Sequence, residues 1–158
     1  MENSTTSSGL KTLVEVTKAD SRIKKAQLLP HPDSRLDSFL MKIHPISDED
    51  VPYRDLTNLE TKKESLGQLI DKLNVTKSTR YQRTVEDTYC NVYSYDYCYF
   101  AKVYLPTIWW TDEALQRVLN GEEVEPVFGE TVDNIYSSAI HDWFGVWGAS
   151  FGWKKMTD

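Results

Sequence analysis

Hydrophobic residues recur at helical spacing between residues 56 and 74. They fall on one stripe, opposite lysines and a glutamine, which is typical of a helix with one buried face. Thr57 stands three residues before Glu60, the spacing of a capping box. The pattern predicts a helix from Thr57 to about Asn74, with Gly67 inside it as a point of close packing on a sheet. The buried stripe would comprise Leu56, Leu59, Leu66, Leu69, Ile70 and Leu73.

Two further helices are predicted nearer the C-terminus. Thr111 can cap the first of them, and Asp112 and Glu113 follow in the first turn, where the helix dipole favours anions. Asn120 and Gly121 provide its stop signal. The second has apolar residues at i, i+3, i+4 and i+7 spacing and should end near a glycine at position 145. Its apolar face would comprise Val132, Ile135, Tyr136, Ala139, Ile140, Trp143, Phe144 and Trp147.

The tyrosine-rich stretch Thr88–Trp110 has the composition of a β-strand, because Tyr, Val and Phe suit a pleated, half-buried surface. At about 3.3 Å per residue it is too long for one strand of a compact chain. Ser94 and Asp96 can close a turn, so we predict a hairpin with arms at about Val85–Tyr93 and Tyr97–Leu105. One bent or bulged strand is the alternative.

Three shorter segments complete the predicted sheet. Thr12–Thr17 and Ser38–Ile46 are interpreted as strands, and Arg22–Leu29 as a strand or a short helix. Residues 1–10 are interpreted as a disordered tail because Ser, Thr, Asn and Gly predominate. We therefore predict one small α+β domain over residues 11–158. It would hold a mainly antiparallel sheet with the tyrosine hairpin and about three helices, the last packed on the sheet.

Composition narrows the class of protein. The chain has 158 residues, 40% of them hydrophobic, which suffices for one core. Neither a signal peptide nor a membrane span is recognisable. Two cysteines are too few for a disulfide framework and stand at no zinc-binding spacing. We expect a soluble cytoplasmic protein without a metal or cofactor.

The net charge of −6 comes from the second half of the chain. Carboxylates outnumber cations most strongly between residues 112 and 142, where Arg117 is the single basic residue. Such a surface repels nucleic acids and anionic membranes and attracts basic partners. Solvation alone also explains it. The carboxylates are Asp112, Glu113, Glu122, Glu123, Glu125, Glu130, Asp133 and Asp142.

Aromatic residues gather beside this acidic segment, in the terminal sequence GVWGASFGW. Large rings are costly to leave in water, so they either cap the core or bury themselves in a partner. Tyrosines of the predicted hairpin could also form a recognition surface, although covering a sheet face is the simpler explanation. The candidate partner-binding residues are Glu122, Glu123, Glu125, Glu130, Trp147, Phe151, Trp153, Tyr95 and Tyr97.

A hydrolase is one alternative. Cys90 or Cys98 would be the nucleophile, His141 the base and Asp142 the residue that orients the imidazole. Neither cysteine is expected to open a helix, where a thiolate would be stabilised. Adjacent His141 and Asp142 would point about 100° apart on a helix.

A binder of single-stranded nucleic acid is the other alternative, because Lys77, Arg80, Arg83 and Lys102 border the tyrosines. Nearby carboxylates offset most of that charge. No motif identifies a family or a reaction. We therefore interpret the chain as a non-enzymatic protein that binds a protein with a basic surface, as an inhibitor, immunity-type protein, adaptor or assembly subunit would, with self-association as a further possibility.

Overall fold

The computed structural model describes residues 20–36, 38–47, 51, 53–55 and 57–156. These residues contain five α-helices and a two-stranded antiparallel sheet, so the fold is mixed α and β. The chain forms two compact units: a central unit, Gln27–Thr107, and a terminal unit, Met1–Ala26 with Ile108–Asp158. The predicted tail and the strand Thr12–Thr17 lie outside the described residues. The single domain stays a prediction.

The first predicted helix is confirmed as α3, Leu59–Leu73, in the central unit. Its cap is Asn58 rather than Thr57. The Asn58 side chain accepts a bond of 2.9 Å from the Thr61 amide, and the Thr61 hydroxyl accepts one of 3.3 Å from the Asn58 amide. Asparagine caps helices as well as threonine does, and the capping box begins one residue later than predicted. The helix ends at Asn74, as predicted, and this residue adopts the left-handed conformation.

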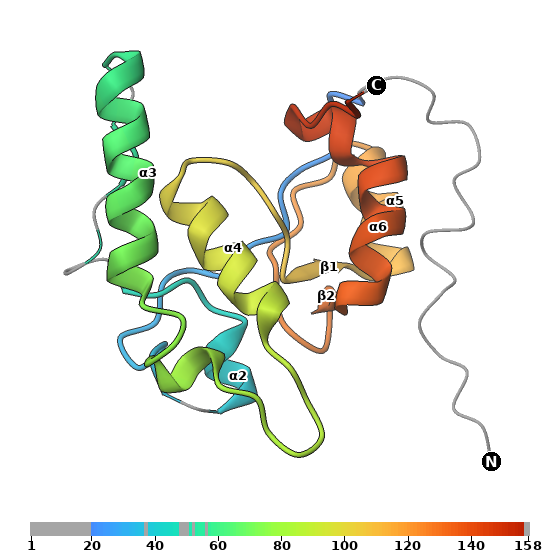
Figure 1. Ribbon diagram of the computed structural model, residues 1–158. Helices are drawn as coiled ribbons and strands as arrows, with labels where there is room; N and C mark the ends of the chain where they lie inside the picture. The colour runs from blue at the N-terminus through green and yellow to red at the C-terminus, as the bar shows by residue number, and fades with distance from the viewer. Residues whose placement is uncertain (1–19, 37, 48–50, 52, 56, 157–158) are drawn as a thin grey trace. The chain divides into compact units, whose positions relative to one another are not determined.

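The buried face of α3 is narrower than its sequence pattern. Leu69 and Leu73 are buried, together with Ser65, whereas Leu59 is 64% and Ile70 50% exposed. Figure 1 shows α3 beside a second helix of the central unit, α4, Cys90–Phe100. The core between them includes Val92 and Phe100 of α4 with Leu69 and Leu73 of α3.

Gly67 makes no close packing contact, contrary to expectation. It is exposed, and a Cβ built on it would meet no atom within 4 Å. We therefore expect Gly67→Ala to raise the free energy of unfolding by about 0.5–1 kcal/mol, because alanine loses less backbone entropy in a helix. Urea denaturation measures this. Gly121→Ala is the matched control: its φ of +87° strains any side chain, so this variant should lose stability. An unchanged or lower midpoint for Gly67→Ala would contradict the prediction.

The predicted tyrosine hairpin is wrong: residues 90–100 form the helix α4. The helix is stabilised from several sides. Val92, Asp96 and Phe100 lie at i, i+4 and i+8 and are buried, and Tyr93 packs its ring at 6.4 Å from that of Tyr97, one turn along. Because β-propensity reports packing rather than an intrinsic backbone preference, tertiary contacts overrode it here.

Two other predicted strands are also absent from their positions. Ser38–Ile46 contains the short helix α2, Phe39–Lys42, and Ile46 makes only an isolated parallel bridge with His31. Residues 22–29, all of them described, adopt neither helix nor strand. The predicted sheet is accordingly much larger than the observed one.

The terminal unit holds the sheet. Strand β1, Ile108–Trp110, pairs antiparallel with β2, Val132–Asn134. Between them, α5, Asp112–Leu119, confirms the second predicted helix: the Thr111 side chain accepts a bond of 3.4 Å from the Ala114 amide. Gly121 after it has a φ of +87°, as a stop signal requires.

The third predicted helix is shorter than its pattern. It begins at Ser137 and ends at Val146, as α6, because residues 132–134 pair with β1 instead. Figure 1 shows α6 beside the two short strands. Trp143 and Trp147 are fully buried there and pack against Trp109 of β1, at 5.5 and 5.9 Å between ring centroids. This aromatic cluster is part of the core of the terminal unit, which also buries Leu115 and Val118 of α5.

Candidate interaction surface

The four candidate acidic residues, Glu122, Glu123, Glu125 and Glu130, lie in the segment between α5 and β2. Glu122 forms an ion pair of 2.9 Å with Arg117. Glu123, Glu125 and Glu130 are exposed, and within the described part of the chain no cation pairs with any of the three. The segment therefore presents uncompensated negative charge.

This segment, residues 120–131, is held in shape by hydrogen bonds to Thr131. The Thr131 hydroxyl donates to the Glu125 carbonyl at 2.5 Å and accepts from the Val127 amide at 2.8 Å. The Thr131 amide donates to the Val127 carbonyl at 2.9 Å. Gly129 reverses the chain with a φ of +81°. The carboxylates are thus carried on an ordered acidic loop, which loses less conformational entropy on binding than a flexible loop would.

The aromatic tail folds back on the core of its own unit. Trp147 is fully buried, and Phe151 stacks on Trp143 at 5.6 Å. Trp153 is half-buried, with its ring edge-on to Phe144 at 4.9 Å. Of the candidate rings in this tail, Trp147 therefore caps the core, and Trp153 keeps part of its surface open to solvent.

Gly148 allows the tail to fold back. A Cβ at this position would lie 3.3 Å from Phe144 Cδ1 and 3.4 Å from Trp153 Cβ. A Cβ would therefore require the Phe144 ring to shift by a few tenths of an ångström.

Other exposed apolar residues were missed by the sequence pattern. Tyr136 is 56% and Phe144 37% exposed, although the helical pattern placed both on a buried face. Tyr136 is the N-cap of α6 and makes no capping bond with its side chain. Val127, at the acidic loop, is also exposed. The apolar residues at helical spacing continue through β2, so their pattern does not indicate that α6 begins only at Ser137.

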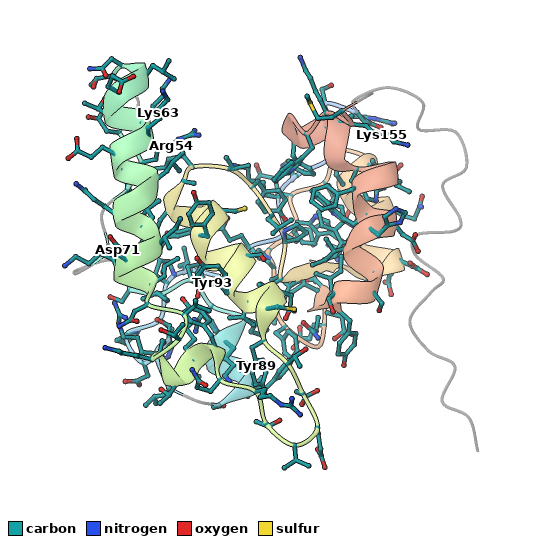
Figure 2. All side chains as sticks on the ribbon, viewed as in Figure 1. Arg54, Lys63, Asp71, Tyr89, Tyr93 and Lys155 are labelled. Carbon is teal, nitrogen blue, oxygen red and sulfur yellow. The ribbon has the colours of Figure 1, made fainter. Side chains whose placement is uncertain are left out.

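The candidate tyrosines belong to the core of the central unit. Tyr95 is only 3% exposed, and burial raises the pKa of its hydroxyl well above the usual range. Tyr97 is half-buried and packs on Tyr93, which Figure 2 labels on the side of α4 that faces α3. The tyrosines therefore serve packing inside this unit, and a ring such as Tyr95 has no free face on which a nucleic-acid base could stack.

Arg80, named above among the cations of a possible nucleic-acid binder, is buried in a network of its own unit. Its guanidinium donates to both carboxylate oxygens of Asp96, at 2.6 and 3.0 Å. The Tyr81 hydroxyl donates to the same carboxylate at 2.8 Å. Burial raises the pKa of Asp96, with the guanidinium acting against that rise, and burial next to Asp96 raises the pKa of Tyr81.

The remaining donors of Arg80 bind backbone carbonyls. They reach His44 at 2.8 Å, Lys42 at 3.1 Å, Met41 at 3.2 Å, and Ser34. Perturbed pKa values often mark active sites, but here every charge is bonded internally. The network therefore joins α4 to the segment 34–44 and has a structural role.

The hydrolase residues lie on two different helices. Cys90 is the first residue of α4 and is exposed, contrary to the expectation that no cysteine opens a helix. Cys98 is half-buried, and burial raises the pKa of its thiol to about 11. His141 and Asp142 lie on α6, both exposed, with 3.5 Å between Nδ1 and Oδ1. A thiol with such a raised pKa is a poor nucleophile near neutral pH.

Cys98 is therefore expected to resist alkylation. In a Cys90→Ser variant, iodoacetamide should modify Cys98 at pH 8 roughly 100-fold more slowly than a thiol of pKa 9.0, because its pKa of about 11 leaves little thiolate. The rate should rise about tenfold per pH unit without a plateau below pH 10. Mass spectrometry follows the reaction, and Cys98→Ser, which retains the exposed Cys90, is the control. Rapid modification of Cys98 at pH 7 would overturn this assignment.

No described helix is both long and apolar enough to cross a membrane. Over residues 20–156, apart from the gaps given above, no group of three or more His, Cys, Asp or Glu side chains is placed to hold a metal ion. Comparison with known proteins finds no matching family model, no similar curated protein and no similar solved structure.

Proposed function

We propose that this chain binds a protein with a basic surface through the acidic loop of its terminal unit. The observation that carries the proposal is the set of three exposed carboxylates, Glu123, Glu125 and Glu130, which lack a cationic partner within the described residues. Unpaired charge of one sign on an ordered loop is complementary to a partner of the opposite sign. An inhibitor, an immunity-type protein, an adaptor or an assembly subunit would work in this way.

The carboxylates of the acidic loop and the nearby apolar side chains contribute to binding in different ways. Carboxylates at the rim of an interface accelerate encounter and lose that effect as salt screens them. Apolar side chains then slow dissociation, because their surface is removed from water when the complex forms. Val127 at the loop and Tyr136 just after β2 supply exposed apolar area in the same unit. The hydrogen bonds of Thr131 hold the loop in one conformation before the partner arrives.

The test begins with capture of partners from the source organism by the wild-type chain at low salt. The triple variant Glu123→Gln, Glu125→Gln and Glu130→Gln should retain the fold but associate with the captured partner about tenfold more slowly, because steering by charge is lost. Its association rate should also depend less on salt. Surface plasmon resonance measures both quantities.

A matched control removes equal charge from the exposed residues of α3. The triple variant Glu60→Gln, Glu64→Gln and Asp71→Asn changes the net charge by the same amount, and all three of its residues are exposed. It should associate at close to the wild-type rate. If both triple variants slow association equally, net charge and not the acidic loop determines binding. If neither does, the loop is only a solvated surface.

A further inference from the structure

A loop of the central unit carries a fully exposed valine. Val85 is 100% exposed, more than any other large apolar side chain of the described residues. It belongs to residues 82–88, here the Val85 loop, which leads from the short 3₁₀-helix η2, Thr79–Tyr81, into α4 and is yellow-green in Figure 1. Every residue of this loop is exposed. The whole segment is therefore accessible to a second protein from solvent.

Few hydrogen bonds hold the backbone of the Val85 loop. The Thr84 amide donates to the Asp87 carbonyl at 2.9 Å, and the Asp87 amide donates to the Thr84 hydroxyl at 3.0 Å. The backbone groups of Val85 and Glu86, at the tip, make no hydrogen bond within the described residues. The two closing bonds are exposed, so water replaces them at little cost when the loop opens.

Both ends of the Val85 loop are fixed to the rest of the central unit. Before the loop, Tyr81 is buried and its hydroxyl donates to Asp96 of α4 at 2.8 Å. After the loop, the ring centroid of Tyr89 lies 3.3 Å from Nζ of Lys42. A loop with fixed ends and a weakly bonded tip can open locally while the unit around it stays folded.

The acidic loop shows the opposite arrangement around its own exposed valine. The Val127 amide donates to the Thr131 hydroxyl at 2.8 Å, and the Val127 carbonyl accepts from the amides of Glu130, Thr131 and Val132 at 3.1, 2.9 and 3.2 Å. An enzyme that binds a peptide in extended form needs main-chain groups that are free to pair with it. The backbone at Val127 would have to lose all these bonds first, whereas the backbone at Val85 has none to lose.

We propose that the Val85 loop is a site of limited proteolysis. An endopeptidase whose pocket accepts a branched aliphatic side chain hydrolyses the bond between Val85 and Glu86, and the cut protein stays folded. As the C–N bond breaks, water supplies a hydroxyl group to the carbonyl carbon of Val85 and a proton to the nitrogen of Glu86. The inference does not depend on the proposed partner.

The cut protein stays together because residues from both sides of the cut build each unit. In the central unit, Arg80 before the cut donates to Asp96 after it at 2.6 and 3.0 Å, and α3 and α4 share one core. The terminal unit combines Met1–Ala26 with Ile108–Asp158. There the indole N–H of Trp110 donates to the Lys24 carbonyl at 2.8 Å. Hydrolysis in the Val85 loop removes none of these contacts.

Brief digestion with pancreatic elastase, which accepts small aliphatic residues, tests the site. Within the described part of the chain, the first cut should follow Val85 and should be about tenfold or more faster than a cut after Val127, because its loop opens more often. Mass spectrometry of the products identifies the bonds. A first cut at another described residue would overturn the proposal.

One substitution tests the role of the valine itself. Val85→Asp should slow the cut after residue 85 about tenfold or more, because an apolar pocket does not accept a carboxylate. Val127→Asp is the matched control and should leave that cut unchanged. If Val85→Asp is cut after residue 85 as fast as the wild type, the enzyme does not recognise this side chain and the proposal fails.

Size-exclusion chromatography of the digested wild type tests whether the cut protein stays folded. The two peptides on either side of the cut should elute together at the position of the uncut chain and separate only in concentrated urea. Far-ultraviolet circular dichroism should be the same before and after the cut. Separation of the peptides in buffer without urea would show that the cut unfolds the protein, contrary to the proposal.

Discussion

Arg80→Met should destabilise the central unit by about 3–5 kcal/mol, because it leaves a buried carboxylate without its cation. Asp96 is 0% exposed and receives two of the guanidinium's hydrogen bonds. Methionine keeps much of the side-chain volume, so loss of the donors dominates the effect. The backbone carbonyls at residues 34, 41, 42 and 44 would lose their donor as well. A loss of this size approaches the whole stability of an ordinary domain.

Denaturant unfolding followed by circular dichroism measures this loss. Arg83→Met is the matched control, since Arg83 is exposed, and it should change stability by less than about 0.5 kcal/mol. The double variant Arg80→Met with Asp96→Asn should recover part of the loss, because it removes the stranded charge. Equal stabilities for Arg80→Met and Arg83→Met would show that the buried network does not hold the unit together.

Trp143→Ala should destabilise the terminal unit by about 3–5 kcal/mol, because removing a buried ring leaves a cavity that its neighbours cannot fill. The Trp143 ring is 0% exposed and contacts Trp109 edge-on at 5.5 Å and Phe151 face-on at 5.6 Å. The contact with Trp109 joins α6 to a strand that lies far away in the sequence. Loss of the two ring contacts should also reduce the near-ultraviolet circular dichroism of the remaining tryptophans.

Trp153→Ala provides the matched control for this variant. Trp153 is half-buried and packs on Phe144 at the surface, so the same substitution should cost clearly less stability. Thermal melting of the two variants makes the comparison. If both lose the same amount, the aromatic cluster of β1 and α6 is not part of the core of this unit.

The candidate surface was only partly readable from the sequence. The excess of carboxylates between residues 112 and 142 is a matter of composition and needs no structure. That Glu122 is paired with Arg117 while Glu123 is unpaired within the described residues depends on how the chain turns after α5. The ordering of the loop by Thr131 likewise depends on hydrogen bonds that no spacing rule predicts. Exposure of Tyr136 followed from the late start of α6.

Helices α3 and α5 were predictable because their signals are local. A capping side chain acts on amides three residues away, and an apolar stripe is set by neighbours within two turns. Thr111 at the start of α5 and Asn74 at the end of α3 stand where the sequence predicts them. The one-residue shift to Asn58 remained within the same local rules.

The tyrosine stretch and the residues before α6 were decided by tertiary contacts. Asp96 is held in a helix by Arg80, which lies 16 residues earlier, and β-propensity carries no information about such a partner. Val132 continues the helical period of α6, yet it pairs with Trp110 of β1. By itself the sequence determined the mixed class, two capped helices and the acidic segment, because caps, stop signals and charge act over a few residues. Where the sequence fits the hydrophobic pattern of a strand as well as that of a helix, only the tertiary structure decided between them. The hydrogen bonds and buried charges that decide come from residues far along the chain.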